Sequence, residues 1–194
     1  DYAFSPRWGF LTACPTNVGT GIRCSVMVHL PALVLSKQVE RVLTAVAQMG
    51  LTVRGLQGEG SEISGSIAQL SNQVTLGVSE EDSVEKLEKM CQQIIAHELE
   101  AQRQLMNEAR EILEDKVFRA YGILRGARIM SSQEAVELVS TLRFGRTSGI
   151  LPDIPYEKMN EILICSRPAH LQKMAGSDLE TRDRDVYRAR YIRQ

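Results

Sequence analysis

Apolar and polar residues alternate in two different ways along this chain of 194 residues. Over roughly the first 75 residues the apolar positions come mostly in short runs bounded by Gly, Pro and Asn, a pattern typical of strands joined by turns. From Ser79 onward they recur every three or four residues, which indicates amphipathic helices. The pattern therefore predicts a sheet followed by a largely helical second half.

The predicted strands begin on either side of a loop rich in turn residues. We expect Phe10–Ala13 and Ser25–Leu30 to be buried strands joined by this tight connection, with Pro31 ending the second. Ser36 is expected to cap a helix from about Lys37 to Met49. Further strands are predicted at 51–54 and 63–75, with Ser71 and Asn72 resembling a turn. These elements predict an α+β fold, in which an antiparallel sheet is flanked by helices on one side.

The second half begins with a strong helix start at Ser79, where a hydroxyl is followed by three acidic residues. One apolar stripe predicts a single helix from there to about Leu113. Further helices are expected at 114–124, 131–144, 156–165 and 168–174. We place one domain at 1–115 and a helical carboxy-terminal region at 116–194.

Composition excludes several classes of protein. Hydrophobic residues at 43% and charged residues at 24% are ordinary for a soluble domain, and the net charge of −1 offers no general attraction to nucleic acid or anionic membrane. No apolar run approaches the roughly 20 residues of a membrane span. The four cysteines show no C-x-x-C spacing, so reduced thiols in the cytoplasm are expected rather than disulfides or zinc. The three histidines are expected to be structural.

The turn-rich loop is the candidate for chemistry. Its glycines, Gly19 and Gly21, would let backbone N–H groups approach a ligand. Arg23 then presents a planar cation that suits phosphate. On composition alone, a β-hairpin with a surface arginine explains the same residues.

Two motifs resemble those of a known family. C-P-T-N-V-G-T-G at Cys14–Gly21, with Arg23 two residues later, is similar to the signature of the phosphagen (guanidino) kinases. R-G-L-Q-G-E at Arg54–Glu59 resembles that family's R-G-x-x-G-E, and Ile67–Gly77 continues in register. Beyond Gly77 the chain is most similar to the bacterial protein-arginine kinases of the McsB type.

The resemblance implies a nucleotide site in which Arg23 and Arg54 bind the phosphates of ATP. Mg²⁺ would be held mainly by the nucleotide and water. Glu59 would contact the guanidinium of the substrate, although a solvated loop glutamate is the alternative. Cys14 matches the family's reactive cysteine, although a small buried side chain is the alternative. The residues implied in nucleotide binding are Arg23, Cys24, Ser25, Val26, Met27, Arg54, Gly55, Leu56, Gln57, Gly58 and Glu59.

The chain ends in a basic segment, residues 182–193. Arg184 and Arg188 are four residues apart and share a helical face with Asp185, so this face offers cations for a phosphate and an anion for a guanidinium. R-D-V-Y-R-A at Arg184–Ala189 resembles the R-D-x-x-R-A motif with which bacterial protein-arginine kinases bind phosphoarginine allosterically. A solvated basic helix is the alternative.

The function implied by the resemblance is ATP-dependent phosphorylation of arginines in proteins, by a chain that is the carboxy-terminal piece of a longer kinase. Further arginines and a catalytic carboxylate would lie upstream, and the fragment alone would be inactive. The implied partners are substrate proteins that include a heat-shock repressor, an activator protein, Clp-type proteolytic machinery and a second copy of the chain. The alternatives are a non-catalytic phosphoarginine-binding adaptor and a kinase of free guanidines, and the R-D-x-x-R-A motif disfavours the kinase of free guanidines.

Overall fold

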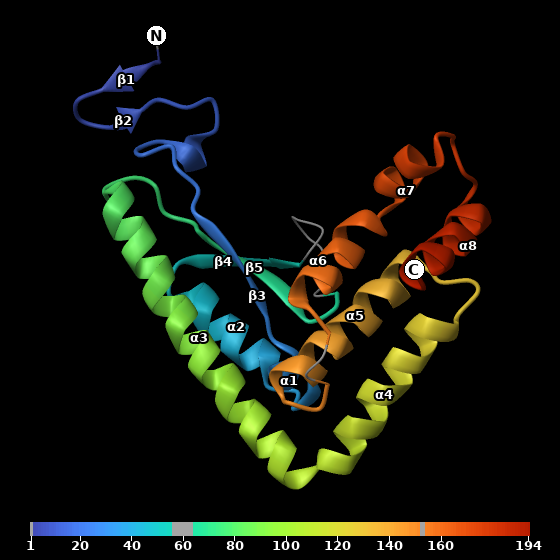
Figure 1. The fold of residues 1–194 in the computed structure, drawn as a ribbon. Coiled ribbons are helices and arrows are strands. Elements are labelled where there is room, and N and C mark those ends of the chain that lie inside the picture. The colour runs from blue at the N-terminus through green and yellow to red at the C-terminus, as the bar shows by residue number, and fades with distance from the viewer. Residues whose placement is uncertain (1, 56–63, 152–153) are drawn as a thin grey trace. The chain divides into compact units, whose positions relative to one another are not determined.

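A computed structural model describes residues 2–55, 64–151 and 154–194 (Figure 1). The chain forms two compact units, one of Asp1–Ile63 and Ile67–Ala101 and the other of Ser64–Ser66 and Gln102–Gln194. Among the described residues, none of the helices combines the length and the apolar composition that a membrane span requires.

The first unit holds two small antiparallel sheets. Strands β1 (Phe4–Ser5) and β2 (Gly9–Phe10) form a hairpin. Strands β3 (Ser25–His29), β4 (Leu51–Gly55) and β5 (Ile67–Asn72) form a second sheet in the order β3-β5-β4, with β5 in the middle. A 3-10 turn lies between the two sheets at Pro15–Asn17, followed along the chain by helices α1 (Pro31–Leu35) and α2 (Val39–Gln48). The predicted α+β class with an antiparallel sheet is thus confirmed.

The three-stranded sheet has one apolar and one mainly polar face. Residues directly opposite each other in an antiparallel pair share a face, so the register Val28↔Ala68 and Val53↔Leu70 puts these side chains together. The apolar face is buried, and α2, which contacts β4 (Figure 1), adds Leu43 and Val46 to the core. Burial of this face against α2 contributes to the stability of the first unit.

The predicted pairing of the strands around the turn-rich loop is wrong. Strand β2 ends at Phe10 and pairs with β1, whereas β3 pairs with β5. A single bridge, Phe10↔Gly19, links the end of the hairpin to the loop. Strand β3 pairs with a segment that lies 38 to 46 residues later in the chain, from His29↔Ile67 to Ser25↔Ser71, a partner that local patterning does not specify.

Two predicted helix boundaries also need correction. Pro31 does begin a new element, but it is the first residue of α1, and Ser36 ends that helix instead of capping the next one. Helix α2 starts at Val39 after Gln38, whose side chain makes no capping bond. Proline is favoured at a first helical position because its missing N–H is not needed there.

The next two N–H groups of α1 are capped from a distant helix. Glu98 of helix α3 (Glu80–Glu108) accepts hydrogen bonds from Ala32 N–H at 2.7 Å and Leu33 N–H at 2.9 Å, and its side chain is buried. The N-cap residue, Leu30, has no side-chain acceptor to do this locally. Burial raises the pKa of Glu98, and the two backbone hydrogen bonds act in the opposite direction.

Helix α3 (Glu80–Glu108) begins as predicted. Ser79 and Asp82 form a reciprocal capping box, with Asp82 N–H donating to Ser79 Oγ at 3.0 Å and Ser79 N–H donating to Asp82 at 3.2 Å. Hydrogen bonding of the Asp82 carboxyl group with the side chain and with the backbone N–H of Ser79 lowers the pKa of Asp82. The helix does not continue to Leu113, because Ala109 leaves the helical region at φ −142° and ψ 32°, and α4 starts at Arg110.

The second unit consists of helices. Buried apolar residues of α4 and α5, which contact each other, form much of its core, and Gly145 of α5 leaves no space for a Cβ beside Val117 of α4. Ser131 caps α5 by accepting from Glu134 N–H, as expected for a predicted start at that residue. The helices are α4 (Arg110–Gly126), α5 (Ser132–Thr147), α6 (Tyr156–Cys165), α7 (Pro168–Ala175) and α8 (Thr181–Ile192).

The capping role of Glu98 predicts a specific loss of stability. Glu98→Ala leaves two buried N–H groups without acceptors and is expected to lower the unfolding free energy of the first unit by about 2–4 kcal/mol. Glu98→Gln retains one acceptor and should cost less. Urea denaturation measures both changes, and a Glu98→Ala protein as stable as wild type would contradict the cap.

The pH dependence of this difference has a defined sign. Because the folded pKa of Glu98 is raised, its contribution is fully present below the pKa of an unfolded glutamate and is lost as the pH rises through the folded value. The advantage of wild type over Glu98→Gln should therefore be larger near pH 4 than near pH 7.

Candidate functional site

The polar face of the three-stranded sheet carries the predicted phosphate-binding arginines. The register places Ser25, Ser71 and Thr52 in one row across β3, β5 and β4 and Met27, Gln69 and Arg54 in the next. Arg23 precedes β3 by two residues, continues the alternation of Ser25 and Met27, and is exposed, as they are. Continued to Arg23, this alternation places the arginine on the side of the sheet that carries Arg54, although Arg23 itself lies before the strand.

The spacing of these two arginines follows from sheet geometry. Arg54 lies in register with Met27, four residues beyond Arg23 and two strands across. At about 3.3 Å per residue and about 4.8 Å per strand, their Cα atoms are about 16 Å apart. Two extended guanidinium groups at this separation can contact different phosphates of one bound triphosphate.

The other residues predicted for the nucleotide site divide by face. Ser25 and Met27 share the face of Arg23, whereas Cys24 and Val26 alternate to the opposite one. Gly55 ends β4 and is buried against the register partner Ala68. The predicted residues Leu56, Gln57, Gly58 and Glu59 lie outside the described residues.

The turn-rich loop is built differently from the predicted cradle of N–H groups. Gly19 N–H donates to Phe10 O at 3.2 Å, Thr20 N–H donates to Thr75 O at 2.9 Å, and Cys24 N–H donates to the Asn72 side chain at 2.8 Å. These N–H groups hold the loop together and are not directed at a ligand. Gly19 N–H in particular is not available to a ligand, so the predicted phosphate contacts of the described residues are those of arginine side chains.

Glycine is required in this loop for close packing. Gly19 has φ +112°, and a Cβ built there would lie 2.1 Å from Thr75 O. Gly9 of β2 has φ +74° and approaches Gly19 O equally closely, since its Cβ would lie 2.4 Å away. The loop is thus packed backbone to backbone between the β1–β2 hairpin and the segment after β5.

Cys14 is exposed at the start of the loop, where its Sγ lies 3.0 Å from Thr16 Oγ1. Within this chain Cys14 is therefore not a buried side chain, and its role beside the acceptor stays a prediction. None of the four cysteines forms a disulfide bond. Among the described residues, no group of three or more His, Cys, Asp and Glu side chains could hold a metal ion.

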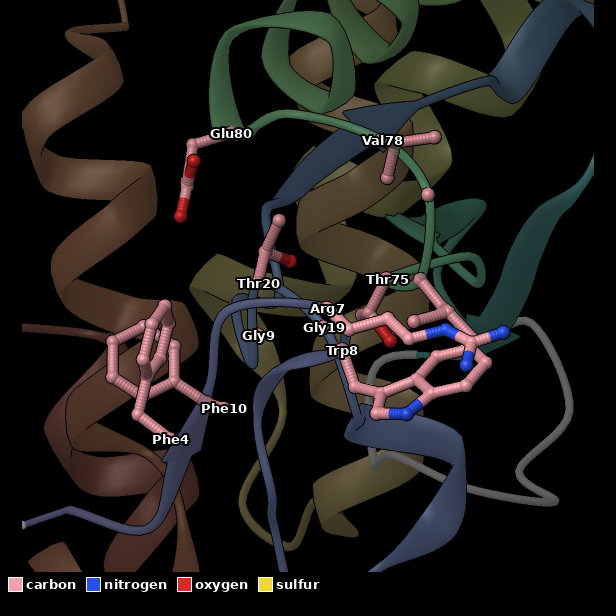
Figure 2. A pocket seen from close by; sticks show the side chains of 12 residues that line it. Phe4, Arg7, Trp8, Gly9, Phe10, Gly19, Thr20, Thr75, Val78 and Glu80 are labelled. Carbon is pink, nitrogen blue, oxygen red and sulfur yellow. The ribbon is translucent and has the colours of Figure 1, made fainter.

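A pocket of about 230 Å³ lies on the hairpin side of the loop (Figure 2). Phe4, Trp8 and Phe10 of the hairpin line it together with Gly19, Thr20 and residues 75–78. The guanidinium of Arg7 lies 4.5 Å from the centre of the Trp8 ring. The described residues of the predicted nucleotide site do not line this pocket, so it is separate from the arginine-bearing face.

The basic tail forms α8, but its second arginine is not a surface charge. Arg188 is 1% exposed and donates to Ser166 O and Met130 O, both at 2.8 Å, and to Asp185 at 2.5 Å. Ala189 is also buried. The solvated-helix alternative is therefore wrong for Arg188, whose guanidinium joins α8 to the α4–α5 loop and to the end of α6.

Arg184 remains partly exposed on the same helix. Its guanidinium donates to Leu179 O at 2.8 Å and Thr181 Oγ1 at 3.1 Å. Asp185 is also partly exposed, with 23% of its side chain accessible. Within the R-D-x-x-R-A motif, Asp185 and Arg188 thus contact each other, whereas the hydrogen bonds described for Arg184 go to Leu179 and Thr181. The binding of phosphoarginine by these residues stays a prediction.

Comparison with known proteins assigns the two halves of the chain. Residues 1–101 match the family described as "ATP:guanido phosphotransferase, C-terminal catalytic domain". The chain belongs to the ATP:guanido phosphotransferase family. Residues 110–194 of this family member match "Protein-arginine kinase McsB C-terminal domain".

Relatives of this phosphotransferase chain carry the name protein-arginine kinase. The protein from Pelotomaculum thermopropionicum is 52% identical over the whole chain, and one from Geobacillus sp. strain WCH70 is 50% identical. This chain covers 54% of each, so it spans about half the length of the curated relatives it matches. Among solved structures, a lombricine kinase is similar to 51% of this chain, with 33% identity, a TM-score of 0.45 and coverage of 26% of that protein.

The buried position of Arg188 predicts a large effect on the stability of the second unit. Arg188→Met leaves two buried carbonyl groups and Asp185 without their donor, and should lower the unfolding free energy by about 3–5 kcal/mol. Arg190→Met is the matched control, because Arg190 is exposed and its guanidinium contacts only the Tyr187 ring among the contacts described for it. Thermal or urea unfolding with equal losses in both variants would contradict a structural role for Arg188.

Proposed function

We propose that this chain is part of a protein-arginine kinase that transfers the γ-phosphoryl group of ATP to arginine side chains of proteins. The observation that carries the proposal is the position of Arg54 on the polar sheet face of a phosphotransferase-family domain, with the exposed Arg23 just before the strand β3 of the same sheet. The match of residues 110–194 to a protein-arginine kinase domain supports arginine in proteins as the acceptor.

The reaction breaks the bond between the γ-phosphorus and the oxygen that bridges it to the β-phosphate, and releases ADP. A new bond forms between phosphorus and a guanidinium nitrogen, which loses a proton. Such transfers depend mainly on alignment and on stabilising negative charge around phosphorus. Arg23 and Arg54 fit this task because guanidinium groups bind phosphate oxygens through two parallel hydrogen bonds.

Mg²⁺, bound chiefly by ATP and water, would neutralise part of the charge on the phosphates. The described residues contribute cations to this site. Arg23, which lies just before β3, is exposed, so its side chain can bind phosphate without first breaking buried contacts. The loop that carries Arg23 is held by hydrogen bonds to Asn72 and Thr75, so little ordering is needed when ATP binds.

The acceptor side of the proposed site combines Glu59 and Cys14. A guanidinium is protonated at ordinary pH, so an anion must hold and orient it and can assist removal of its proton. We assign this role to Glu59, which lies outside the described residues. Cys14, exposed at the loop start, is proposed to lie beside the acceptor, where a neighbouring cation favours its thiolate.

The biological setting is proposed on the same basis. The substrates would be arginine-bearing proteins, including a heat-shock repressor and proteins destined for Clp-type degradation, with an activator protein and a second copy of the chain as partners. ATP and free thiols are characteristic of the cytoplasm, which we propose as the location.

Regulation by phosphoarginine is proposed for α8. The phosphate of phosphoarginine would be bound by Arg184, which is partly exposed, and the guanidinium of the ligand would be bound by Asp185. Because Asp185 also accepts from the buried Arg188, binding there would alter the contact that joins α8 to Met130 and Ser166. A ligand that changes this contact couples the pocket to the packing of the second unit.

The catalytic part of the proposal is tested by removing each arginine. In a protein of the relatives' full length that carries this chain, Arg23→Ala or Arg54→Ala should lower the rate of arginine phosphorylation by about 10²–10³, because each removes a charge-stabilising donor set. Arg41→Ala, on an exposed position of α2, is the control and should retain wild-type activity. Transfer of labelled phosphate from ATP to an arginine-containing protein measures the effect, and wild-type kinetics in Arg23→Ala or Arg54→Ala would refute the assignment.

The proposed phosphoarginine site of α8 is tested by calorimetric titration of the chain. Phosphoarginine should bind more tightly than phosphate or free arginine, because each of those satisfies only one charge of the proposed pocket. Arg184→Gln should remove the preference over arginine, while Arg182→Gln, at an exposed position two residues away, should keep it. Equal, weak binding of all three ligands would exclude the pocket. Phosphoarginine binding by a full-length protein without kinase activity would instead identify a non-catalytic adaptor.

A further inference from the structure

We propose that Asn72 and Thr75 are positioning residues, which hold the turn-rich loop from Cys14 to Cys24 and thereby fix the location of Arg23. The catalytic consequence rests on the proposed function, whereas the effect on the loop can be measured without it. Both residues are buried, and both lie at or just after the end of β5, far from the loop in sequence.

Asn72 binds the backbone on both sides of Arg23. Its Oδ1 accepts from Cys24 N–H at 2.8 Å, and its Nδ2 donates to Ile22 O at 3.1 Å. The backbone N–H of Asn72 also donates to Cys24 O at 3.2 Å. One side-chain amide therefore fixes the peptide groups before and after Arg23, so that the arginine leaves the chain in a fixed direction.

Asn72 also shapes its own segment. A second Nδ2 hydrogen bond, to Val74 O at 3.3 Å, bends the chain after β5 towards the loop. All the hydrogen-bonding capacity of the Nδ2 group is used by these two carbonyls. A side chain without both a donor and an acceptor cannot reproduce this arrangement.

Thr75 holds the first half of the loop. Its Oγ1 lies 3.0 Å from Thr16 O and 2.8 Å from Val18 O, so its single hydroxyl proton is shared between these carbonyls. Its own carbonyl accepts from Thr20 N–H at 2.9 Å. Thr75 thus forms hydrogen bonds with three residues of the C-P-T-N-V-G-T-G motif.

The packing around Gly19 makes these contacts mutually dependent. Gly19 lies so close to Thr75 O that no Cβ fits between them, and the hairpin residue Phe10 exchanges two backbone hydrogen bonds with Gly19. If Thr75 moves, the loop loses both its hydrogen bonds and the surface against which it packs. The segment 72–75 is therefore the support on which the loop and Arg23 are built.

Amide hydrogen exchange of the 194-residue chain tests the effect on the loop. Thr75→Val keeps the branched shape but removes the hydroxyl, and Thr75→Ser keeps the hydroxyl. Peptides covering residues 16–24 should exchange about tenfold faster in Thr75→Val, while Thr75→Ser restores most of the protection. Gln73→Ala, at an exposed neighbouring position, is the control and should match wild type.

The same experiment separates positioning from general destabilisation. Peptides from α2 and α3 should exchange as in wild type, because they do not contact the Thr75 side chain through any hydrogen bond described for it. Faster exchange throughout the first unit would show that Thr75 stabilises the whole unit and has no specific role in holding the loop, which would contradict the inference. Unchanged exchange at residues 16–24 would overturn the inference outright.

A double-mutant cycle in the full-length kinase tests the link to Arg23. Asn72→Leu should lower kcat/KM for ATP, and Asn72→Leu combined with Arg23→Ala should be no slower than Arg23→Ala alone, because Asn72 acts through Arg23. If the fold losses in kcat/KM of the two single variants multiply in the double variant, Asn72 does not act through Arg23. Absence of phosphate transfer in the wild-type protein would refute the proposed function and leave the exchange result to decide the positioning role.

Discussion

Strand β5 is the constraint on which the first unit depends, because every hydrogen bond of the three-stranded sheet involves it. Its pairing with β3 and β4 assigns each side chain of those strands to one of two faces. One face is apolar and buried beneath α2. The other face carries Arg54 of β4 and the exposed residues of β3, the strand that follows Arg23. A shift of one residue in either pairing would exchange the faces and bury an arginine, so core burial and the position of the candidate site are specified together.

Buried polar side chains in both units act on backbone groups. Glu98 caps α1, Asn72 and Thr75 hold the loop, and Arg188 binds two carbonyls and an aspartate. A buried polar group is stable only when its hydrogen bonds are satisfied, and irregular segments leave backbone groups that supply them. These side chains therefore bind backbone groups that have no partner within a helix or strand. In the loop, Asn72 and Thr75 do this while the side chain of Arg23 stays exposed.

Local signals in the sequence were sufficient for much of the fold. The helix start at Ser79, the helix at 156–165 and the strand at 51–54 were predicted close to their observed positions, since caps, periodicity and bounding turn residues lie within a few positions of each other. The break at Ala109 was not predicted, because no glycine or proline marks it. The role of Ser36 was also misassigned, because the residue suits either end of a helix and only the packing of α1 decides between them.

The sequence by itself determined which chemical groups are present and how they alternate: the C-P-T-N-V-G-T-G and R-G-x-x-G-E motifs, and Arg23, Ser25 and Met27 on one side of a strand. Only the tertiary structure decided that Arg54 shares that face, that Asn72 and Thr75 support the loop, and that Arg188 is buried. The reason is physical. Alternation is a property of neighbouring residues, whereas the contact between Asn72 and Cys24 joins positions 48 residues apart, and its formation depends on the packing of everything between them.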